Sequence, residues 1–505
     1  MLKMKNVLFF AVLASLLFSC SKEPIISEFS SNEAIDVDAV IDEHLHRNND
    51  IFNWDVVNID VLWTAIEQGD HIVTVGYGTN GQYALANTTE LKAQKEELLN
   101  DILTMERRAT RNDLKLNDIF LNANEVLAYF DIIIKDKATL EYLKEEKNLR
   151  YVEPSNYIYK KEEKGQNNSY KLLSDGLGCG TSGETINPQD YTVVAPAAWV
   201  PWNFYSHNIP QAWNESTGAN IEVGIVDTGI SPVQDNFSTE FNTGLSNGRT
   251  AGKDGTYVSS WWPWADPDGP DDLCGHGTSM AAAIAAPRTG ENVPVGVAYN
   301  SNLFTVRGAV DVTVDGYGSQ NGVTDAIVLL ANRNSTKVIS MSLGNLTYVG
   351  KIADAIRYAV NYRGKLFFSA GGTSSSLTSW IGVTFPATMA ETVAVTGVTN
   401  ASDYEACGKC HSGSAIDFTI IMEREEDSDR RSVMLGFEDN WVNYIGGSSV
   451  ATATTAGIAA LVWSKHPNWT SNDVLNALKA ASDFYPSRHS DFGYGNIDAL
   501  QAVQQ

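Results

Sequence analysis

Positive charge is scarce in this chain. Its 505 residues include 36 lysines and arginines against 61 aspartates and glutamates, which gives a formal net charge of -25. Nucleic acid is bound mainly through clustered lysine and arginine side chains, so this deficit argues against a nucleic-acid partner. A surface this acidic favours solubility and, in some proteins, cation binding. No internal repeat is evident either, which argues against a repeat architecture.

Hydrophobic runs of membrane length are also lacking. The 12-residue apolar run Val7 to Phe18 is too short to span a bilayer comfortably. Lys3 and Lys5 precede it, as in a targeting segment. It ends in Leu17-Phe18-Ser19-Cys20, which resembles a bacterial lipobox. The alternative is an ordinary secretory signal with an incidental cysteine.

The lipobox resemblance has consequences for the whole chain. It implies a signal peptide over residues 1–19, lipidation of Cys20 and an acidic tether over residues 20–50. The protein would then be an exported lipoprotein of the bacterial cell envelope, periplasmic or cell-surface, held at the membrane by a lipid anchor rather than spanning it.

Cysteine is rare as well. Without Cys20, four of the five cysteines remain: Cys179, Cys274, Cys407 and Cys410. An even number in an exported protein predicts disulfides, and four cysteines allow three pairings. The Cys407-Gly408-Lys409-Cys410 spacing also suits a redox or half-zinc motif. No second pair at metal spacing exists, so a structural bridge is favoured.

The chain is long enough for two folded units. Residues 51–165 alternate strand-like and helix-like patterns, which predicts a small α+β domain. The expected strands and helices are His71–Val75, Glu90–Arg107, Val126–Ile134, Ala138–Glu146 and Arg150–Pro154. Residues 166–198 are expected to form an exposed linker with the maturation site.

Residues 199–505 alternate buried-type strands with helical patterns. The strands are expected at Ile221–Val226, Leu303–Val306, Val338–Met341 and Leu366–Ser369, with helices over Gly322–Ala331 and Ile352–Val360. This alternation predicts an α/β fold with a parallel sheet and helices on both faces. Sites in such folds form at the carboxyl ends of strands and at nearby helix N-termini.

Three polar residues fit that rule. Asp227 closes a predicted strand, His276 lies in a Gly turn that opens a helix, and Ser449 opens another small-residue helix after Gly446-Gly447-Ser448. A serine needs a base to become a nucleophile, a histidine can supply it near neutral pH, and an aspartate can orient the imidazole. Taken singly, each residue is equally well a helix cap, a core histidine or a turn former.

Together, the three segments resemble the signatures of the subtilisin family of serine peptidases. The motifs are Asp227-Thr228-Gly229, Gly275-His276-Gly277-Thr278 and Gly447-Ser448-Ser449-Val450-Ala451. The resemblance implies a serine endopeptidase with Asp227, His276 and Ser449 as its triad, no required cofactor, and protein or peptide substrates. Ser342-Leu343-Gly344 resembles the substrate-binding strand.

The first unit resembles the inhibitory propeptide of such peptidases, chiefly through Leu140–Leu143 and Tyr151–Pro154. The resemblance implies a zymogen whose own propeptide acts as an intramolecular inhibitor. The alternative is an independent binding domain.

Two segments depart from the family pattern. Gly372 stands where the family usually has an oxyanion-binding Asn, so the Thr373 hydroxyl or a backbone amide is expected to donate instead. A catalytically weak or inactive subtilisin-fold binding or scaffold lipoprotein is the alternative function. The second departure is the segment Ala406–Asn440, which carries two cysteines and an acidic run.

An acidic loop lies just before His276. Its carboxylates could bind calcium, but they lack the spacing of a known calcium loop, so a solvated acidic loop is favoured and calcium is the alternative. The candidate ligands are Asp266, Asp268, Asp271 and Asp272.

Overall fold

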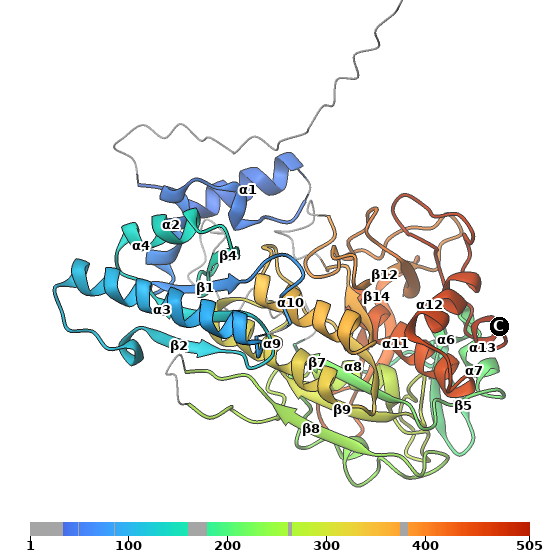
Figure 1. The fold of residues 1–505 in the computed structure, drawn as a ribbon. Coiled ribbons are helices and arrows are strands. Elements are labelled where there is room, and N and C mark those ends of the chain that lie inside the picture. The colour runs from blue at the N-terminus through green and yellow to red at the C-terminus, as the bar shows by residue number, and fades with distance from the viewer. Residues whose placement is uncertain (1–33, 49, 85, 160–178, 261–264, 374–381) are drawn as a thin grey trace, which may run out of the picture.

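The computed structural model describes residues 34–48, 50–84, 86–159, 179–260, 265–373 and 382–505. The predicted signal peptide, Cys20 and the tryptophans at 261, 262 and 264 lie outside these residues. Two units with separate sheets lie side by side, the first coloured blue to cyan in Figure 1 and the second green to red.

The first unit has a four-stranded sheet in the order β2-β3-β1-β4, with every neighbouring pair antiparallel. Asparagine, threonine and aspartate side chains cap its helices: Asn58 accepts from two amides of α2, Thr88 caps α3 and Asp136 caps α4. The elements are α1 (Val37–Asn48), α2 (Ile59–Gln68), β1 (Ile72–Tyr77), α3 (Thr89–Thr110), β2 (Phe120–Ala123), β3 (Tyr129–Ile133), α4 (Lys137–Glu145) and β4 (Leu149–Pro154).

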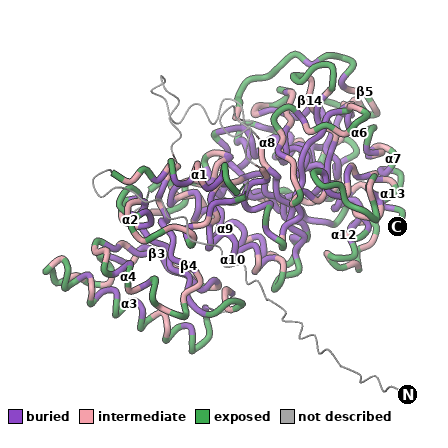
Figure 2. Tube along the Cα trace, turned by 90° about the horizontal axis from the view of Figure 1, so that it is seen from above, coloured by how far each residue is buried: buried purple, intermediate pink, exposed green. Residues whose placement is uncertain are grey.

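Both faces of this small sheet are covered. Its own helices α1 to α4 pack on one face, where side chains such as Val75 and Phe130 join theirs in one core. Tyr129 and Tyr151 on the other face pack with side chains of α9 and α10 from the second unit. All six residues of β1 are therefore buried, and Figure 2 shows the exposed surface of this unit on α3 and α4.

The second unit is built on nine strands in the order β15-β14-β13-β12-β11-β10-β7-β9-β8. Its strands are β7 (Glu222–Asp227), β8 (Ala251–Gly255), β9 (Asn302–Arg307), β10 (Thr336–Met341), β11 (Leu366–Ala370), β12 (Val393–Thr399), β13 (Phe418–Arg424), β14 (Asp427–Leu435) and β15 (Val442–Ile445), beside a two-stranded ribbon of β5 (Tyr191–Val194) and β6 (Ala198–Pro201). Its α-helices are α6 (Trp202–Ser206), α7 (Ile209–Ala212), α8 (His276–Ala285), α9 (Gly316–Asn332), α10 (Gly350–Arg357), α11 (Gly447–Lys465), α12 (Ser471–Ala480) and α13 (Ala499–Val503).

The parallel sheet and its two helical layers confirm the predicted α/β class. The seven strands from β13 to β8 pair in parallel, and only β14 and β15 add antiparallel pairs. Side chains of α9 and α10 pack on one face, and those of α8, α11, α12 and α13 on the other. The segment that departs from the family pattern supplies the β13–β14 hairpin.

Two predicted boundaries are wrong. Residues 37–48 of the predicted tether form α1, because Val37, Val40, Ile41 and Leu45 bury an apolar face in the first unit. Residues 179–198 of the predicted linker belong to the second unit. There, the buried Asp190 carboxylate receives hydrogen bonds from Arg424, Arg430 and Tyr444.

The four cysteines form two disulfides, Cys179–Cys274 and Cys407–Cys410. The first pairing ties the start of the second unit to the turn before His276, and the second confirms the structural bridge expected of the CxxC spacing. Among the helices that the structure describes, none is long and apolar enough to cross a membrane.

Candidate active site

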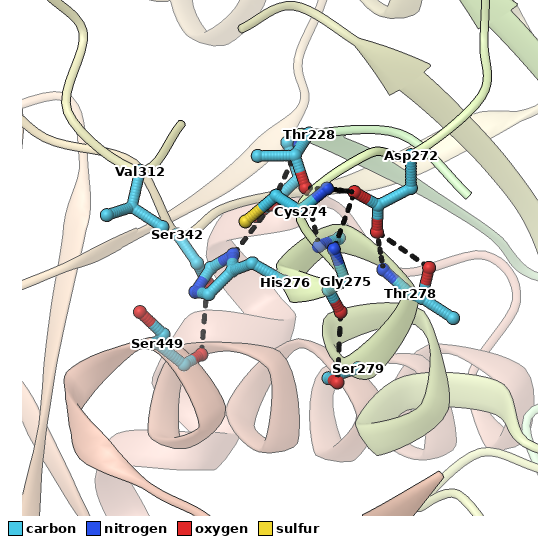
Figure 3. A network of polar contacts seen from close by, with 12 residues as sticks. Thr228, Asp272, Cys274, Gly275, His276, Thr278, Ser279, Val312, Ser342 and Ser449 are labelled. Carbon is cyan, nitrogen blue, oxygen red and sulfur yellow. Dashed lines mark hydrogen bonds and ion pairs between the residues drawn. The ribbon is translucent and has the colours of Figure 1, made fainter. Parts of the chain in front are cut away.

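The three triad candidates come from three elements that meet at one edge of the sheet. Asp227 ends β7, His276 begins α8, and Ser449 lies in the first turn of α11. Figure 3 shows the imidazole of His276 on the side of α8 that faces the start of α11, where Ser449 lies. The structure thus brings together residues that are 49 and more positions apart.

Close glycine contacts make this meeting possible. A Cβ atom at Gly277 would lie 2.3 Å from the carbonyl oxygen of Gly229, and Gly229 itself has a φ of +110°. A side chain at Gly277 would push the turn after Asp227 away from α8, and one at Gly229 would collide with the loop before α8, because its Cβ would lie 2.4 Å from the carbonyl oxygen of Pro270. Gly457 has the same role farther along α11, where a Cβ would lie 2.7 Å from Cβ of Val297.

The Asp227 carboxylate holds the imidazole of His276. Nδ1 of His276 lies 2.7 Å from Oδ1 of Asp227, which also accepts the amide of Thr228 at 2.8 Å. A carboxylate only accepts hydrogen bonds, so Nδ1 carries the proton and Nε2 carries a lone pair. His276 is only 1% exposed, and Nε2 has no hydrogen-bond partner among the described residues.

Electrostatics then set the basicity of this imidazole. Burial by itself lowers the pKa of His276, but the charge and hydrogen bond of Asp227, with smaller contributions from Asp272 and Asp311, raise it above its ordinary value. The imidazole must be neutral to accept a proton. The active fraction of a base in this position therefore rises with pH through the raised pKa.

The paired serines have different environments. Ser448 is buried, and its Oγ accepts the amide of Gly372 at 3.1 Å and lies 3.0 Å from the Thr373 hydroxyl. Ser449 is partly exposed, and its carbonyl accepts the Ser342 hydroxyl at 3.0 Å. Ser448 thus holds the neighbouring segment, whereas Ser449 is the more accessible of the two serines and stays the predicted nucleophile.

Asp272 has a role that the sequence did not reveal. Its Oδ1 accepts from the Thr228 hydroxyl and the amides of Cys274 and Gly275, and its Oδ2 from the amide and hydroxyl of Thr278. These five bonds fix the start of α8 relative to the turn after β7 (Figure 3). Only the position of Asp272 before the His276 motif could have hinted at this role.

The other calcium candidates do not gather around Asp272. Asp271 pairs with Lys253, Asp268 accepts from Ser259, and Asp266 is exposed. Within the described ranges, no group of three or more His, Cys, Asp or Glu side chains is arranged to hold a metal ion. The described residues therefore hold no ligand cluster for the alternative in which this loop binds calcium.

The predicted substrate-binding strand is already paired. The Gly344 amide donates to the Val312 carbonyl at 3.1 Å, and its carbonyl accepts the Val314 amide at 2.9 Å. Leu343 is buried in the core, and Ser342 contacts Ser449 through its hydroxyl. A peptide that used the backbone of Gly344 would have to displace residues 312–314.

The oxyanion segment, defined here as Gly371–Thr373, lies against the start of α11. The Gly372 amide donates to Ser448 Oγ, and the Thr373 hydroxyl accepts the Ser448 amide at 3.3 Å. The Thr373 hydroxyl is thus engaged with Ser448, so its expected role as an oxyanion donor stays a prediction. A side chain at position 372 would not fit, because a Cβ there would lie 2.5 Å from Nδ1 of His411.

The model of the subtilase family (peptidase S8) matches residues 218–496. An alkaline protease of Alkalihalobacillus alcalophilus is 27% identical over 317 residues, which cover 63% of this chain and 73% of the relative. Subtilisin E of Bacillus subtilis (strain 168) is 28% identical over 319 residues, 63% of this chain and 74% of the relative.

A solved structure resembles both units. The crystal structure of fervidolysin from Fervidobacterium pennivorans, a keratinolytic enzyme related to subtilisin, has a TM-score of 0.57 at 18% identity, and the match covers 86% of this chain and 61% of that one. The fold and the meeting of Asp227, His276 and Ser449 define a serine peptidase of the subtilisin type. Since the family model matches more than half of the residues, the chain belongs to the subtilase family.

We predict that a fluorophosphonate probe labels Ser449 and not Ser448. Ser449→Ala should abolish labelling. Ser448→Ala should keep the label but lower Tm in a melting experiment, because it leaves the Gly372 amide without its acceptor, which costs about 1–3 kcal/mol of stability. Intact-mass measurement of the labelled variants tests this, and a label that survives Ser449→Ala would show that the nucleophile is misassigned.

Proposed function

We propose that this chain is an exported, lipid-anchored serine endopeptidase that is made as a zymogen. In this proposal, Ser449 Oγ attacks the carbonyl carbon of a peptide bond while His276 Nε2 accepts the hydroxyl proton. The same nitrogen then donates that proton to the leaving amine, which leaves an acyl group on Ser449 that water hydrolyses. The Asp227–His276 hydrogen bond supports the proposal because it presents Nε2 as a base.

The observation that carries the zymogen proposal is the way the first unit docks on the second. Arg150 places Nη1 2.7 and 2.6 Å from the two oxygens of Asp354 on α10, and the Tyr151 hydroxyl donates to Asp354 at 2.7 Å. Both charged side chains are almost completely buried. If the two units separated, each of these buried charges would lose its partner, and an unpaired buried charge is strongly destabilising. The two units therefore match each other as a specific pair.

Two further contacts use the N-terminal ends of the second unit's helices. Glu153 Oε2 accepts the amide of Gly350, the first residue of α10, at 2.8 Å. Asn156 accepts the amide of Tyr317 in the first turn of α9 at 2.9 Å. Amides in a first helical turn have no partner within the helix, so side chains of the first unit satisfy two of them.

The apolar part of the contact is equally specific. A Cβ at Gly76 would lie 2.4 Å from the Tyr151 ring, and one at Gly350 would lie 2.7 Å from it. The ring therefore fits between β1 and α10 only because both positions are glycine. This close fit favours a built-in partner over an incidental neighbour.

The docked unit also lies next to the predicted substrate strand. Phe52 pairs with the segment that follows Gly344: its amide donates to Leu346, and its carbonyl accepts from Tyr348 at 2.7 Å. A unit bound there would obstruct peptide access along residues 342–348. This supports the role of intramolecular inhibitor over that of an independent binding domain.

A catalytically weak binding protein is the second candidate. Gly372 and the occupied backbone of Gly344 favour it, because both depart from what a ready peptidase requires. The fluorophosphonate experiment separates the two, since a scaffold without a competent nucleophile would not react.

We predict that maturation is autocatalytic. Ser449→Ala expressed alone should accumulate as a chain that retains the first unit, whereas the wild type should separate the two units by a cut within residues 166–178, the part of the predicted linker that precedes the second unit. Gel mobility and N-terminal sequencing provide the measurement. Cutting of the variant at the same bond would show that another peptidase does the processing.

We predict that rising pH weakens the contact between the units through Glu153. Burial raises the pKa of Glu153 to about 8. The stability that this group contributes is complete below its unfolded pKa and is lost as pH rises through about 8. In the Ser449→Ala background, Tm should fall between about pH 5 and about pH 8.5, and Glu153→Gln should reduce that fall.

Glu153→Gln keeps an oxygen that can accept from Gly350, so it isolates the charge. Glu141→Gln, on the exposed face of α4, is the matched control and should leave the pH dependence unchanged. An equal fall in Tm for the Glu153→Gln and control variants would rule out Glu153 as the source.

We predict that Cys20 carries the membrane anchor. The lipobox-like sequence before it supports this assignment. Cys20→Ser should move the protein from the membrane fraction to the soluble fraction in a bacterial host that lipidates such signals. The readout is fractionation with immunoblotting, together with the mass of the N-terminal peptide. Unchanged membrane retention would point to another anchor.

A further inference from the structure

Gly372 is held from two sides. On one side its amide donates to Ser448 Oγ at 3.1 Å. On the other its carbonyl accepts the amide of His411 at 3.0 Å, and Thr373 pairs with Cys410. His411, which supports the oxyanion segment on the side opposite Ser448, thus comes from a loop nearly 40 positions away.

The His411 ring occupies the space that a side chain at position 372 would need. A Cβ built on Gly372 would lie 2.5 Å from Nδ1 of His411 and 3.0 Å from two atoms of Thr384. No real side chain fits at that distance. Gly372 also has a φ of +118°, which residues with a side chain rarely adopt, so the backbone conformation and the His411 ring both exclude a side chain at this position.

The ring is itself firmly held. His411 is 4% exposed, and its Nδ1 donates to the Gly382 carbonyl at 2.9 Å. Its own carbonyl accepts the Thr396 hydroxyl at 2.5 Å. The Cys407–Cys410 disulfide closes the turn before it, and the Cys407 amide donates to Gly397.

We propose that His411 is a positioning residue that holds the oxyanion segment in place of a side chain at position 372. The ring and the backbone amide of His411 support Gly372 from the side opposite Ser448. This keeps residues 371–373 against the start of α11, where charge develops on the substrate oxygen during acyl transfer. Support of this kind affects the transition state more than substrate binding, so it acts on kcat. The inference rests on the proposed peptidase function.

The first test is steady-state kinetics on a fluorogenic peptide chosen by profiling a library with the wild-type enzyme. His411→Ala should lower kcat about tenfold or more while KM stays within about twofold. His411→Asn should retain more of the rate, because its amide can still donate to the Gly382 carbonyl. Added imidazole should restore part of the rate to His411→Ala by refilling the space that the ring leaves.

The matched control is His207→Ala. His207 is another fully buried histidine, and it bonds to Ile497 and Ile421 far from the oxyanion segment. This variant should lower Tm but leave kcat unchanged. If His411→Ala behaves in the same way, with a lower Tm and an unchanged kcat, His411 is merely structural and the inference is wrong.

A second measurement does not depend on activity. In His411→Ala, hydrogen exchange at the Gly372 and Thr373 amides should accelerate at least tenfold, and in His207→Ala it should not. A wild type that cleaves no library peptide would contradict the proposed function, and the exchange result would still decide the role of His411. Unchanged exchange in His411→Ala would overturn the inference.

A double variant tests the shared space directly. Gly372→Asn alone should lower kcat, because its Cβ would collide with the His411 ring. Combined with His411→Ala, the two losses should be less than additive by about tenfold, since the collision is gone. Strictly additive losses would show that the ring and position 372 do not share one space, and the inference would fail.

Discussion

The contact between the turn after β7 and the first turn of α8 is the constraint on which the active site depends. The Gly277 amide donates to the Thr228 hydroxyl, and that hydroxyl donates to Asp272. Asp272 in turn accepts the amides that precede and open α8. Every bond in this cluster is buried. The cluster therefore helps to fix the distance between Asp227 and His276, which does not depend on their single hydrogen bond alone.

The main architecture, and the meeting of the three triad candidates in space, could be predicted from the sequence because their signals are local. The signals are a strand that ends in Asp-Thr-Gly and two Gly turns that open small-residue helices. Each can be recognised from a few consecutive residues. The strands around Ile225, Phe304 and Ile339 were likewise found from short apolar runs. These strands are continuous apolar runs because the parallel sheet is buried on both of its faces.

What the sequence missed depends on partners that are distant along the chain. The segment that begins at Cys179 looked like a linker, since its membership in the second unit rests on a disulfide to Cys274 and on Arg424 and Arg430 binding Asp190. Residues 37–48 are predicted as a tether because their few apolar side chains form a recognisable helix face only when they pack into the core of the first unit. Two further features could not be predicted from nearby residues. They are the pairing of Gly344 with residues 312–314 and the position of His411.

The two sides of the candidate active site differ in how far along the chain their supporting contacts come from. On the triad side, the buried hydrogen bonds of Asp272 and the bond between Asp227 and His276 set the geometry within one contiguous turn cluster. On the oxyanion side, Gly372 contributes no side chain, and its position depends on a disulfide-closed loop and on Ser448. The nucleophile and base could therefore keep their geometry while support for the oxyanion varied. Substitutions in the residues packed around position 372 are therefore expected to change kcat while the triad cluster stays intact.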